Sequence, residues 1–399
     1  MRLIAVISLL LCPLSAASSK EFFVLQGVDK THSDQLVSQP GLSGFTIRVS
    51  WRKLHEEGFG WLDEQIRRGD ELDVDLQLRV MAGVSAPANL PGVSYFEYLS
   101  TDFDGASEIR RVPVPWDAAM HQHWQALAAN LANRYGSNPR VKVVHVPSFA
   151  NSSELHMPVE VTELAGYSSR ALSEAWAALA APLAAAFPQA IVSLNYATPT
   201  QARIAGDDAA WLVDEMAALA GSRAGYQAND LAAHVSLERN KYQTLIAQEQ
   251  LGRHVGFQMV SSSNAARFGG QFLEAVQIAA VVGAQWLEIY AADIGRIPPA
   301  GDYNLNGAVD AADYVAWRKL LGQTGNGLAG DGNGDNQIDR RDYDVWLAHF
   351  GLGVSSEPAV GPATNSAVPE SATFVLLLTG ILALMVAHGR PRRRVAALV

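Results

Sequence analysis

The stretch Val141-Lys-Val-Val-His-Val-Pro147 is followed by an alanine- and leucine-rich segment, 159–187, and then by Ile191-Val-Ser-Leu-Asn-Tyr196. The two apolar runs have the length of β-strands, and the segment between them carries apolar residues at helical spacing. Two strands joined through a helix are typical of a parallel βαβ unit. The stretch therefore predicts an α/β fold.

The same order of strand and helix recurs on both sides of this unit. Further helical patterns cover 115–135, 209–220 and 271–282. Eight strands alternating with helices in under 300 residues predict a (β/α)₈ TIM barrel over 20–297. A doubly wound open sheet is the alternative, but no Gly-x-Gly-x-x-Gly follows the first strand, so a dinucleotide site has no support. The eight expected strands are 22–28, 44–49, 74–81, 141–147, 191–196, 232–237, 255–260 and 285–290.

Composition narrows the class of protein. Among 399 residues, 49% are hydrophobic and 18% charged, which is globular rather than disordered. The formal net charge is −10, and a nucleic-acid-binding protein would normally be basic. Five of the 30 Lys and Arg lie at the two ends, so the middle is more acidic still and suits cations or neutral substrates. These five are Arg2, Arg390, Arg392, Arg393 and Arg394.

The N-terminus has the layout of a secretory signal peptide. Arg2 precedes an apolar run, and small residues follow it up to Ala17. The only cysteine, Cys12, lies inside this run, so a mature chain has no disulfide, zinc-thiolate site or cysteine nucleophile. We expect residues 1–17 to be removed and the rest to be exported to the cell surface or the extracellular space.

The C-terminus carries a second apolar segment. Residues 372–388 would form a helix about 25 Å long, just enough to span a bilayer. The arginine run that follows would stay in the cytoplasm. With Val368-Pro-Glu-Ser371, the region 369–394 resembles a PEP-CTERM sorting signal, although Ser371 departs from its motif. A plain membrane anchor is the alternative. Residues 352–368 are expected to be a linker.

Polar residues at the carboxyl ends of the strands are the candidates for a site, because barrel enzymes place their chemistry there. Alternation puts Trp286, Glu288 and Tyr290 on one face of the last strand, so Glu288 should point into the barrel. A charge there needs a partner, which Arg48 or Arg79 could supply.

The segment Gly44-Phe-Thr-Ile-Arg-Val-Ser-Trp51, with Gln77-Leu-Arg-Val-Met-Ala-Gly83, resembles clan A glycoside hydrolases, which are retaining (β/α)₈ enzymes. The resemblance implies Glu154 as general acid/base, with Asn151 before it. The clan's nucleophile, a glutamate on strand seven, corresponds to Gln258, so Glu288 or Glu238 would have to replace it. We expect an exported glycosidase with Glu154 as proton donor and Glu288 as second carboxylate. The alternative is a glycan-binding or surface-assembly protein with a degenerate barrel. The expected substrate-binding residues are Arg48, Trp51, Arg79, His145, Asn151, Asn195, Glu238, Gln258, Trp286 and Tyr290.

Residues 302–351 contain a tandem repeat with the oxygen-ligand spacing of a twelve-residue calcium loop. Position 6 of such a loop needs a left-handed turn, which suits Gly307 and Asn336. The first predicted calcium ion is held by Asp302, Asn304, Asn306, Ala308 (backbone carbonyl), Asp310 and Asp313. The second is held by Asp331, Asn333, Asp335, Gln337 (backbone carbonyl), Asp339 and Asp342.

A short helix follows each loop, and aspartate rather than glutamate stands at position 12. This loop–helix duplication resembles a type I dockerin, a small all-α calcium-binding domain. The resemblance implies docking to a cohesin-like domain and attachment to a polysaccharide-degrading enzyme.

Overall fold

The computed structural model describes residues 21–101, 107–150, 154–325 and 328–353. The predicted signal peptide, most of the predicted linker, and the predicted sorting signal with its 372–388 helix lie outside the described residues. Within the described ranges, no helix has both the length and the apolar character needed to cross a membrane.

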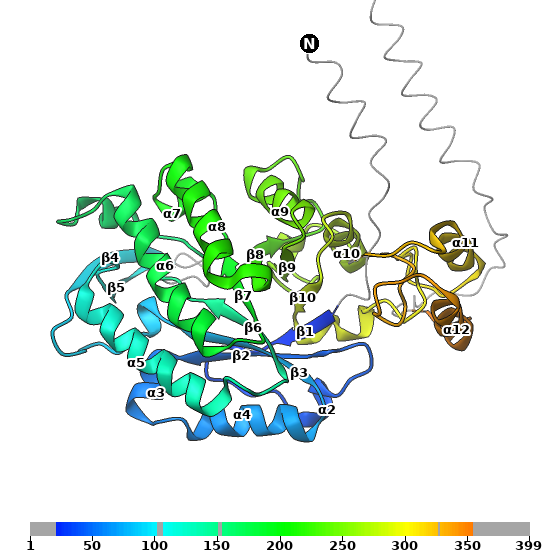
Figure 1. Ribbon diagram of the computed structural model, residues 1–399, viewed down its shortest axis with the longest axis horizontal. Coiled ribbons are helices and arrows are strands. Elements are labelled where there is room, and N and C mark those ends of the chain that lie inside the picture. Colours follow the sequence, from blue (N-terminus) through cyan, green and yellow to red (C-terminus); the bar gives the residue numbers. More distant parts are fainter. Residues whose placement is uncertain (1–20, 102–106, 151–153, 326–327, 354–399) are drawn as a thin grey trace, which may run out of the picture. The chain divides into compact units, whose positions relative to one another are not determined.

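Eight parallel strands close into a barrel, which confirms the predicted (β/α)₈ architecture (Figure 1). The order around the barrel is β1-β10-β9-β8-β7-β6-β3-β2, so the first strand pairs with the last. Sequential strands are therefore neighbours throughout, apart from a small hairpin inserted after β3. The strands are β1 (Glu21–Leu25), β2 (Gly44–Ser50), β3 (Asp75–Met81), β6 (Val141–Val146), β7 (Ile191–Asn195), β8 (Ala224–Leu231), β9 (His254–Met259) and β10 (Trp286–Ile289).

The sixth barrel strand is not where the sequence pattern placed it. The prediction chose 232–237, but β8 is Ala224–Leu231, and 232–237 belongs to the loop after it. The prediction rested on apolar runs, and β8 is not one. It alternates polar Gln227 and Asn229, which face the barrel interior, with Tyr226 and Ala228, which face the helices.

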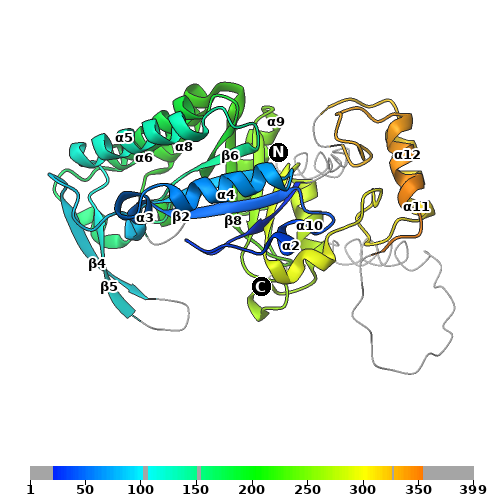
Figure 2. The ribbon, with the colours of Figure 1, turned by 90° about the horizontal axis from the view of Figure 1, so that it is seen from below.

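Helices cover the outside of the strands, and α5, α6 and α8 pack against one another (Figure 1). The predicted helices are present with shifted starts. The antiparallel hairpin β4–β5 was not predicted and extends away from the barrel strands (Figure 2). The α-helices of the barrel are α2 (Asp34–Val37), α3 (Trp51–Glu56), α4 (Gly60–Glu71), α5 (Ala118–Tyr135), α6 (Ser169–Ala186), α7 (Pro199–Ala202), α8 (Gly206–Ala220), α9 (Asn240–Gln250) and α10 (Phe272–Val281). The hairpin strands are β4 (Tyr95–Thr101) and β5 (Ser107–Pro113), and the 3₁₀ helices are η1 (Gly83–Ser85), η2 (Val159–Glu163), η3 (Gly221–Arg223), η4 (Ala266–Phe268) and η5 (Ala291–Arg296).

An apolar plug fills one level of the barrel interior. Phe23, Val143 and Trp286 form a buried cluster separate from the main core outside the strands. The Trp286 ring lies directly over Gly256, where an added Cβ would come within 1.9 Å of the ring. Position 256 therefore requires glycine so that the indole can fill the barrel.

The repeat region forms two loop–helix units with reciprocal contacts. Trp317 on α11 (Ala311–Leu320) donates its indole N–H to the carbonyl of Asp339 at 3.0 Å. Trp346 on α12 (Arg340–His349) donates in the same way to Asp310 at 2.8 Å. Tyr303, Trp317 and Ile338 form the small core between the units. The duplication seen in the sequence is thus also a structural duplication.

Candidate functional site

The barrel interior above the Trp286 plug is polar. One buried side chain after another projects inward from the strands and joins a hydrogen-bonded network. Such a network is costly to bury unless its members find partners, and several atoms within it have none. The buried inward-facing residues are Thr46, Gln77, Arg79, His145, Ser193, Asn195, Gln227 and Glu288.

Glu288 lies at the centre of this network. As predicted, it points into the barrel and meets a barrel arginine, which is Arg79 rather than Arg48. The Glu288 Oε2 atom accepts from Arg79 Nη2 at 2.8 Å and from Gln227 Nε2 at 2.6 Å. Glu288 and Arg79 both have no exposed surface. Burial raises the pKa of Glu288, but Arg79, His145 and the polar side chains of Thr46 and Gln227 together outweigh it and hold the pKa below the ordinary value. Glu288 is therefore ionised at neutral pH, and its Oε1 has no hydrogen-bond partner among the described residues.

Two predicted binding residues hold this ion pair in place. Arg79 Nη1 donates to Gln258 Oε1 at 3.0 Å, so the strand-seven glutamine acts as a neutral acceptor. His145 lies 3.1 Å from Asn195 Oδ1 and 3.0 Å from Gln77 Oε1, and both of its ring nitrogens have partners. Burial lowers the pKa of His145 to about 3, so the ring is neutral. A neutral ring has a single N–H and can donate to only one of these two oxygens, and the buried Asn195 Nδ2 has no hydrogen-bond partner among the described residues.

Glu154 occupies a second polar cluster, where β8 ends. It is 5% exposed, and its Oε1 accepts from the backbone N–H of Asn229 at 2.7 Å and from Lys241 Nζ at 2.9 Å. His156 Nε2 lies 3.1 Å from Oε2. Lys241 also pairs with Asp230 at 3.2 Å. Burial raises the pKa of Glu154, but His156 and Lys241 outweigh it and lower the pKa to about 2. This environment keeps the carboxylate ionised, which opposes the predicted role as a proton donor acting alone.

The two carboxylates are connected through β8. Gln227 Nε2 contacts both Glu288 and Asn229 Oδ1, the latter at 2.8 Å, while the Asn229 N–H contacts Glu154. These three hydrogen bonds, with one Asn residue between them, limit the separation of the nearest carboxylate oxygens to at most about 12 Å. Glycosidase carboxylates are about 5–5.5 Å apart in retaining enzymes and about 6.5–9.5 Å apart in inverting ones. The arrangement is compatible with either class.

Three other predicted site residues, Trp51, Trp286 and Glu238, do not lie where the predicted roles require them. Trp51 is 2% exposed and packs edge-on against Trp124, so it is a core residue and has no free face for a sugar. Trp286 is the buried plug, and its indole N–H donates to Gln227. Glu238 is exposed in the loop before α9, because the strand assigned to it lies earlier in the chain. It therefore cannot be the second carboxylate in this arrangement.

Arg48 and Tyr290 are partly exposed and lie near Glu288 and Arg79, which influence the charge of both. Asn151 lies outside the described residues. Sequence reasoning missed Lys241, His156, Gln227 and Asn229. His156 could have been found from its position two residues after Glu154. Lys241 had no signal, because it looks like an ordinary first-turn residue of α9.

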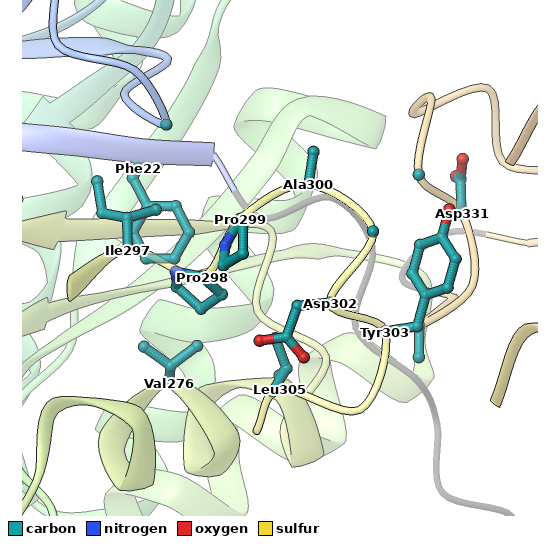
Figure 3. Close-up of a pocket in the computed structure, with 14 residues that line it drawn as sticks. Phe22, Val276, Ile297, Pro298, Pro299, Ala300, Asp302, Tyr303, Leu305 and Asp331 are labelled. Carbon is teal, nitrogen blue, oxygen red and sulfur yellow. The ribbon is translucent and has the colours of Figure 1, made fainter. Parts of the chain in front are cut away.

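The two repeat loops have the backbone expected of calcium loops. Position 6 adopts the predicted left-handed conformation in both, with φ of 91° at Gly307 and 64° at Asn336. Asp302 Oδ2 accepts from the Gly307 N–H at 2.7 Å, and Asp331 Oδ2 accepts from the Asn336 N–H at 2.8 Å. Figure 3 shows Asp302 on the segment that continues from Ile297 into the first loop.

The charge of these loops fits a hard cation. Asp302, Asp313, Asp331 and Asp342 are each no more than 5% exposed. Burial raises the pKa of Asp302 to about 6, and the charge of Asp313 adds to the rise. Among the described residues, no three His, Cys, Asp or Glu side chains are gathered as a metal site. Amide and backbone oxygens would therefore have to complete each ligand set, as in twelve-residue calcium loops.

No family model and no curated protein matches the chain. Among solved structures, a family 10 endoxylanase from a sugarcane soil metagenome is 12% identical, with a TM-score of 0.41, and covers 68% of this chain and 84% of its own. An intracellular xylanase from Thermoanaerobacterium saccharolyticum is 10% identical, with a TM-score of 0.43, and covers 69% and 86%. Xylanase 10B from Thermotoga petrophila, in complex with xylobiose, is 12% identical, with a TM-score of 0.41, and covers 69% and 82%. Values this low assign neither family nor activity, so we argue the function from the side chains.

Proposed function

We propose that the barrel hydrolyses an O-glycosidic bond of a poly- or oligosaccharide by a two-carboxylate mechanism. The observation that supports this most directly is that two buried, ionised carboxylates, Glu154 and Glu288, are both held by β8 residues two positions apart. The barrel interior contains polar atoms without partners among the described residues, and these atoms can form hydrogen bonds with the hydroxyl groups of a sugar.

Glu288 takes the role of the anionic carboxylate. Oε2 is oriented by Arg79 and Gln227, which leaves Oε1 to face the anomeric carbon or the attacking water. A nucleophile or base must be ionised, and the ion pair with Arg79 maintains that state. Because Glu288 has no exposed surface, substrate entry has to move the side chains that cover it.

The proton for the leaving oxygen comes from Glu154 and His156 together. A carboxylate with a pKa near 2 is ionised at neutral pH, so Glu154 does not hold the proton by itself. The His156 Nε2 atom lies 3.1 Å from Glu154 Oε2, so we assign the imidazole as the group that carries the proton beside the carboxylate. Lys241 fixes Glu154 from the other side and acts as a positioning residue.

Hydrolysis of a broad glycan panel by the mature chain tests this proposal. We expect Glu154→Gln, Glu288→Gln and His156→Asn each to reduce turnover by about 10²–10⁴-fold. Glu238→Gln is the matched control, because Glu238 is exposed and outside both clusters. Thermal melts establish that each variant is folded at the assay temperature. Full activity of Glu154→Gln on a substrate that the wild type cleaves would refute the acid/base assignment.

A second candidate is a barrel that binds a glycan without cleaving it. Two observations favour it: Glu288 is held in a fully buried ion pair with Arg79, and Gln258 stands where the resembled enzymes carry their nucleophile. The same panel decides between the two. Binding without cleavage, combined with unchanged binding by Glu288→Gln, supports this second function.

We further propose that residues 302–351 bind two calcium ions through the ligands named above and dock to a cohesin-like domain. The raised pKa of Asp302, Asp313 and Asp331 and the repeated N–H contacts support a cation there. Export with attachment through 369–394 completes the proposal, since an oxidising, calcium-rich exterior suits a cysteine-free calcium domain. Titration calorimetry of the mature chain with calcium tests it, with Asp302→Ala and Asp331→Ala each expected to remove one ion.

A further inference from the structure

On one side of the barrel interior, two arginine side chains lie near a single buried carboxylate. Arg48 on β2 and Arg79 on β3 are paired across the sheet at the same level. Arg79 takes Glu288 as its ion-pair partner. Arg48 makes no ion pair and no hydrogen bond through its side chain with any residue in the described ranges, and its Nε is buried without a partner. A guanidinium stays charged in a protein, and the carboxylate that attracts Arg48, Glu288, is already paired with Arg79, so the two arginines share one negative charge.

The surroundings of Arg48 confirm the imbalance. Burial, followed by repulsion from Arg79, lowers the pKa of Arg48 to about 10. Arg267 adds positive potential at the neighbouring Tyr290. The nearest acid in the loop after β1, Asp29, accepts from the N–H and the hydroxyl of Ser50 at 2.8 and 2.7 Å, and it makes no ion pair with Arg48 in the described chain.

A second residue with unpartnered polar atoms lies one position past β1, the strand that pairs with β2. Gln26, which follows β1, has no exposed surface, and within the described residues neither its amide oxygen nor its amide nitrogen has a partner. Its backbone is bonded to Thr46, on the same face of β2 as Arg48. Leaving buried polar groups unpaired is unfavourable, so a polar ligand that reached them would gain affinity. Arg48 remains partly exposed, so the site is open to solvent.

We infer that Arg48 binds the oxyanion of a single acidic sugar unit, which we identify as the carboxylate of a uronic acid. The inference rests on the proposed function for its ligand class, since it places the acidic unit at the mouth of the proposed glycosidase site. A planar guanidinium matches a planar carboxylate with two parallel hydrogen bonds. One unpaired arginine in an acidic chain matches one negative charge rather than a polyanion. A sulfate ester on a sugar offers related chemistry and is separated by experiment.

The test is calorimetric binding by the mature chain of methyl glucuronoside and methyl galacturonoside, compared with their neutral methyl esters and with glucose 6-sulfate. Binding is measured at a temperature and over a time at which product analysis shows no cleavage of the glycosides. We expect at least one uronate to bind about 10–100-fold more tightly than its ester, as one charge-assisted contact provides. Tighter binding of the sulfate than of either uronate would reassign the ligand and overturn the uronate identification.

Arg48→Gln should remove the preference for the acid, whereas Arg67→Gln, an exposed arginine on α4, should keep it. Equal affinity of the wild type for acid and ester overturns the inference whether or not Arg48→Gln folds. The outcome is separable from the proposed function. Uronate binding without hydrolysis leaves the inference standing and removes the glycosidase proposal, while hydrolysis of a neutral glycan without uronate preference does the reverse.

Discussion

The buried ion pair between Arg79 and Glu288 leads to the sharpest prediction about stability. Both side chains have no exposed surface, and their charged atoms are 2.8 Å apart. In Glu288→Gln the shape remains, but Arg79 becomes a buried charge without a counter-ion. Removal of one partner of such a pair costs about 3–5 kcal/mol. We expect the lower end of this range, because the glutamine oxygen can still accept from Arg79.

The size of the effect can be followed by calorimetric melting of the mature chain. At about 2–4 °C per kcal/mol for domains of 150–250 residues, a cost near the lower end lowers the Tm of the barrel by roughly 6–12 °C. The double variant Arg79→Met/Glu288→Gln removes both charges. It should be more stable than Glu288→Gln alone, since no unpaired charge remains. The control is Glu238→Gln, an exposed carboxylate whose loss should leave the Tm unchanged.

The single variant Arg79→Met tests the direction in which stability changes with pH. Without Arg79, burial is the dominant influence on Glu288 and raises its pKa above the ordinary value. A raised carboxyl pKa means that stability is present below the unfolded pKa and declines as the pH rises above it. Arg79→Met should therefore be closer to wild type at pH 4 than at pH 7. A Glu288→Gln variant that melts with the wild type, or an Arg79→Met variant with no pH dependence of its own, refutes the assignment of a stabilising buried pair.

Three further predictions concern other parts of the molecule. The pKa of Glu154 is lowered from 4.5 to about 2, so the stability that its charge contributes is present above about pH 4.5 and is lost as the pH falls toward 2. The Tm difference between wild type and Lys241→Met should therefore shrink over that range. A constant difference would contradict the pairing of Glu154 with Lys241. Gly256→Ala should destabilise the barrel by about 1–3 kcal/mol because its Cβ would meet the Trp286 ring, whereas Gly206→Ala, which has open space, should not; chemical denaturation measures both. In the second repeat loop Arg341 pairs with Asp335 at 2.7 Å, while Ala312 stands at the equivalent place in the first. On the proposed calcium function, Arg341→Ala should strengthen calcium binding at one of two sites in a titration, and an equal change at both contradicts this.

Local patterns in the sequence determined most of the architecture. Seven of the eight barrel strands coincide with apolar runs, because a strand buried against helices must be apolar on that face whatever its partners are. The left-handed residues of the repeat loops were also predictable, since the conformation at Gly307 and Asn336 is set by neighbours within the same twelve residues. The remaining strand, β8, is the sixth of the barrel. Its predicted position was wrong because Gln227 and Asn229 make β8 less apolar than the loop after it.

The site depended on tertiary structure. The sequence predicted that Glu288 faces inward and needs an arginine, but it left Arg48 and Arg79 as alternatives. The closed barrel decides this, because Arg79 reaches from β3 across the interior to Gln258 and Glu288 on β9 and β10. Glu154 likewise pairs with Lys241, a residue in a helix 87 positions later. Strand periodicity fixes which face a side chain occupies, whereas barrel closure and register determine which distant side chain it meets, and charge state follows from that meeting.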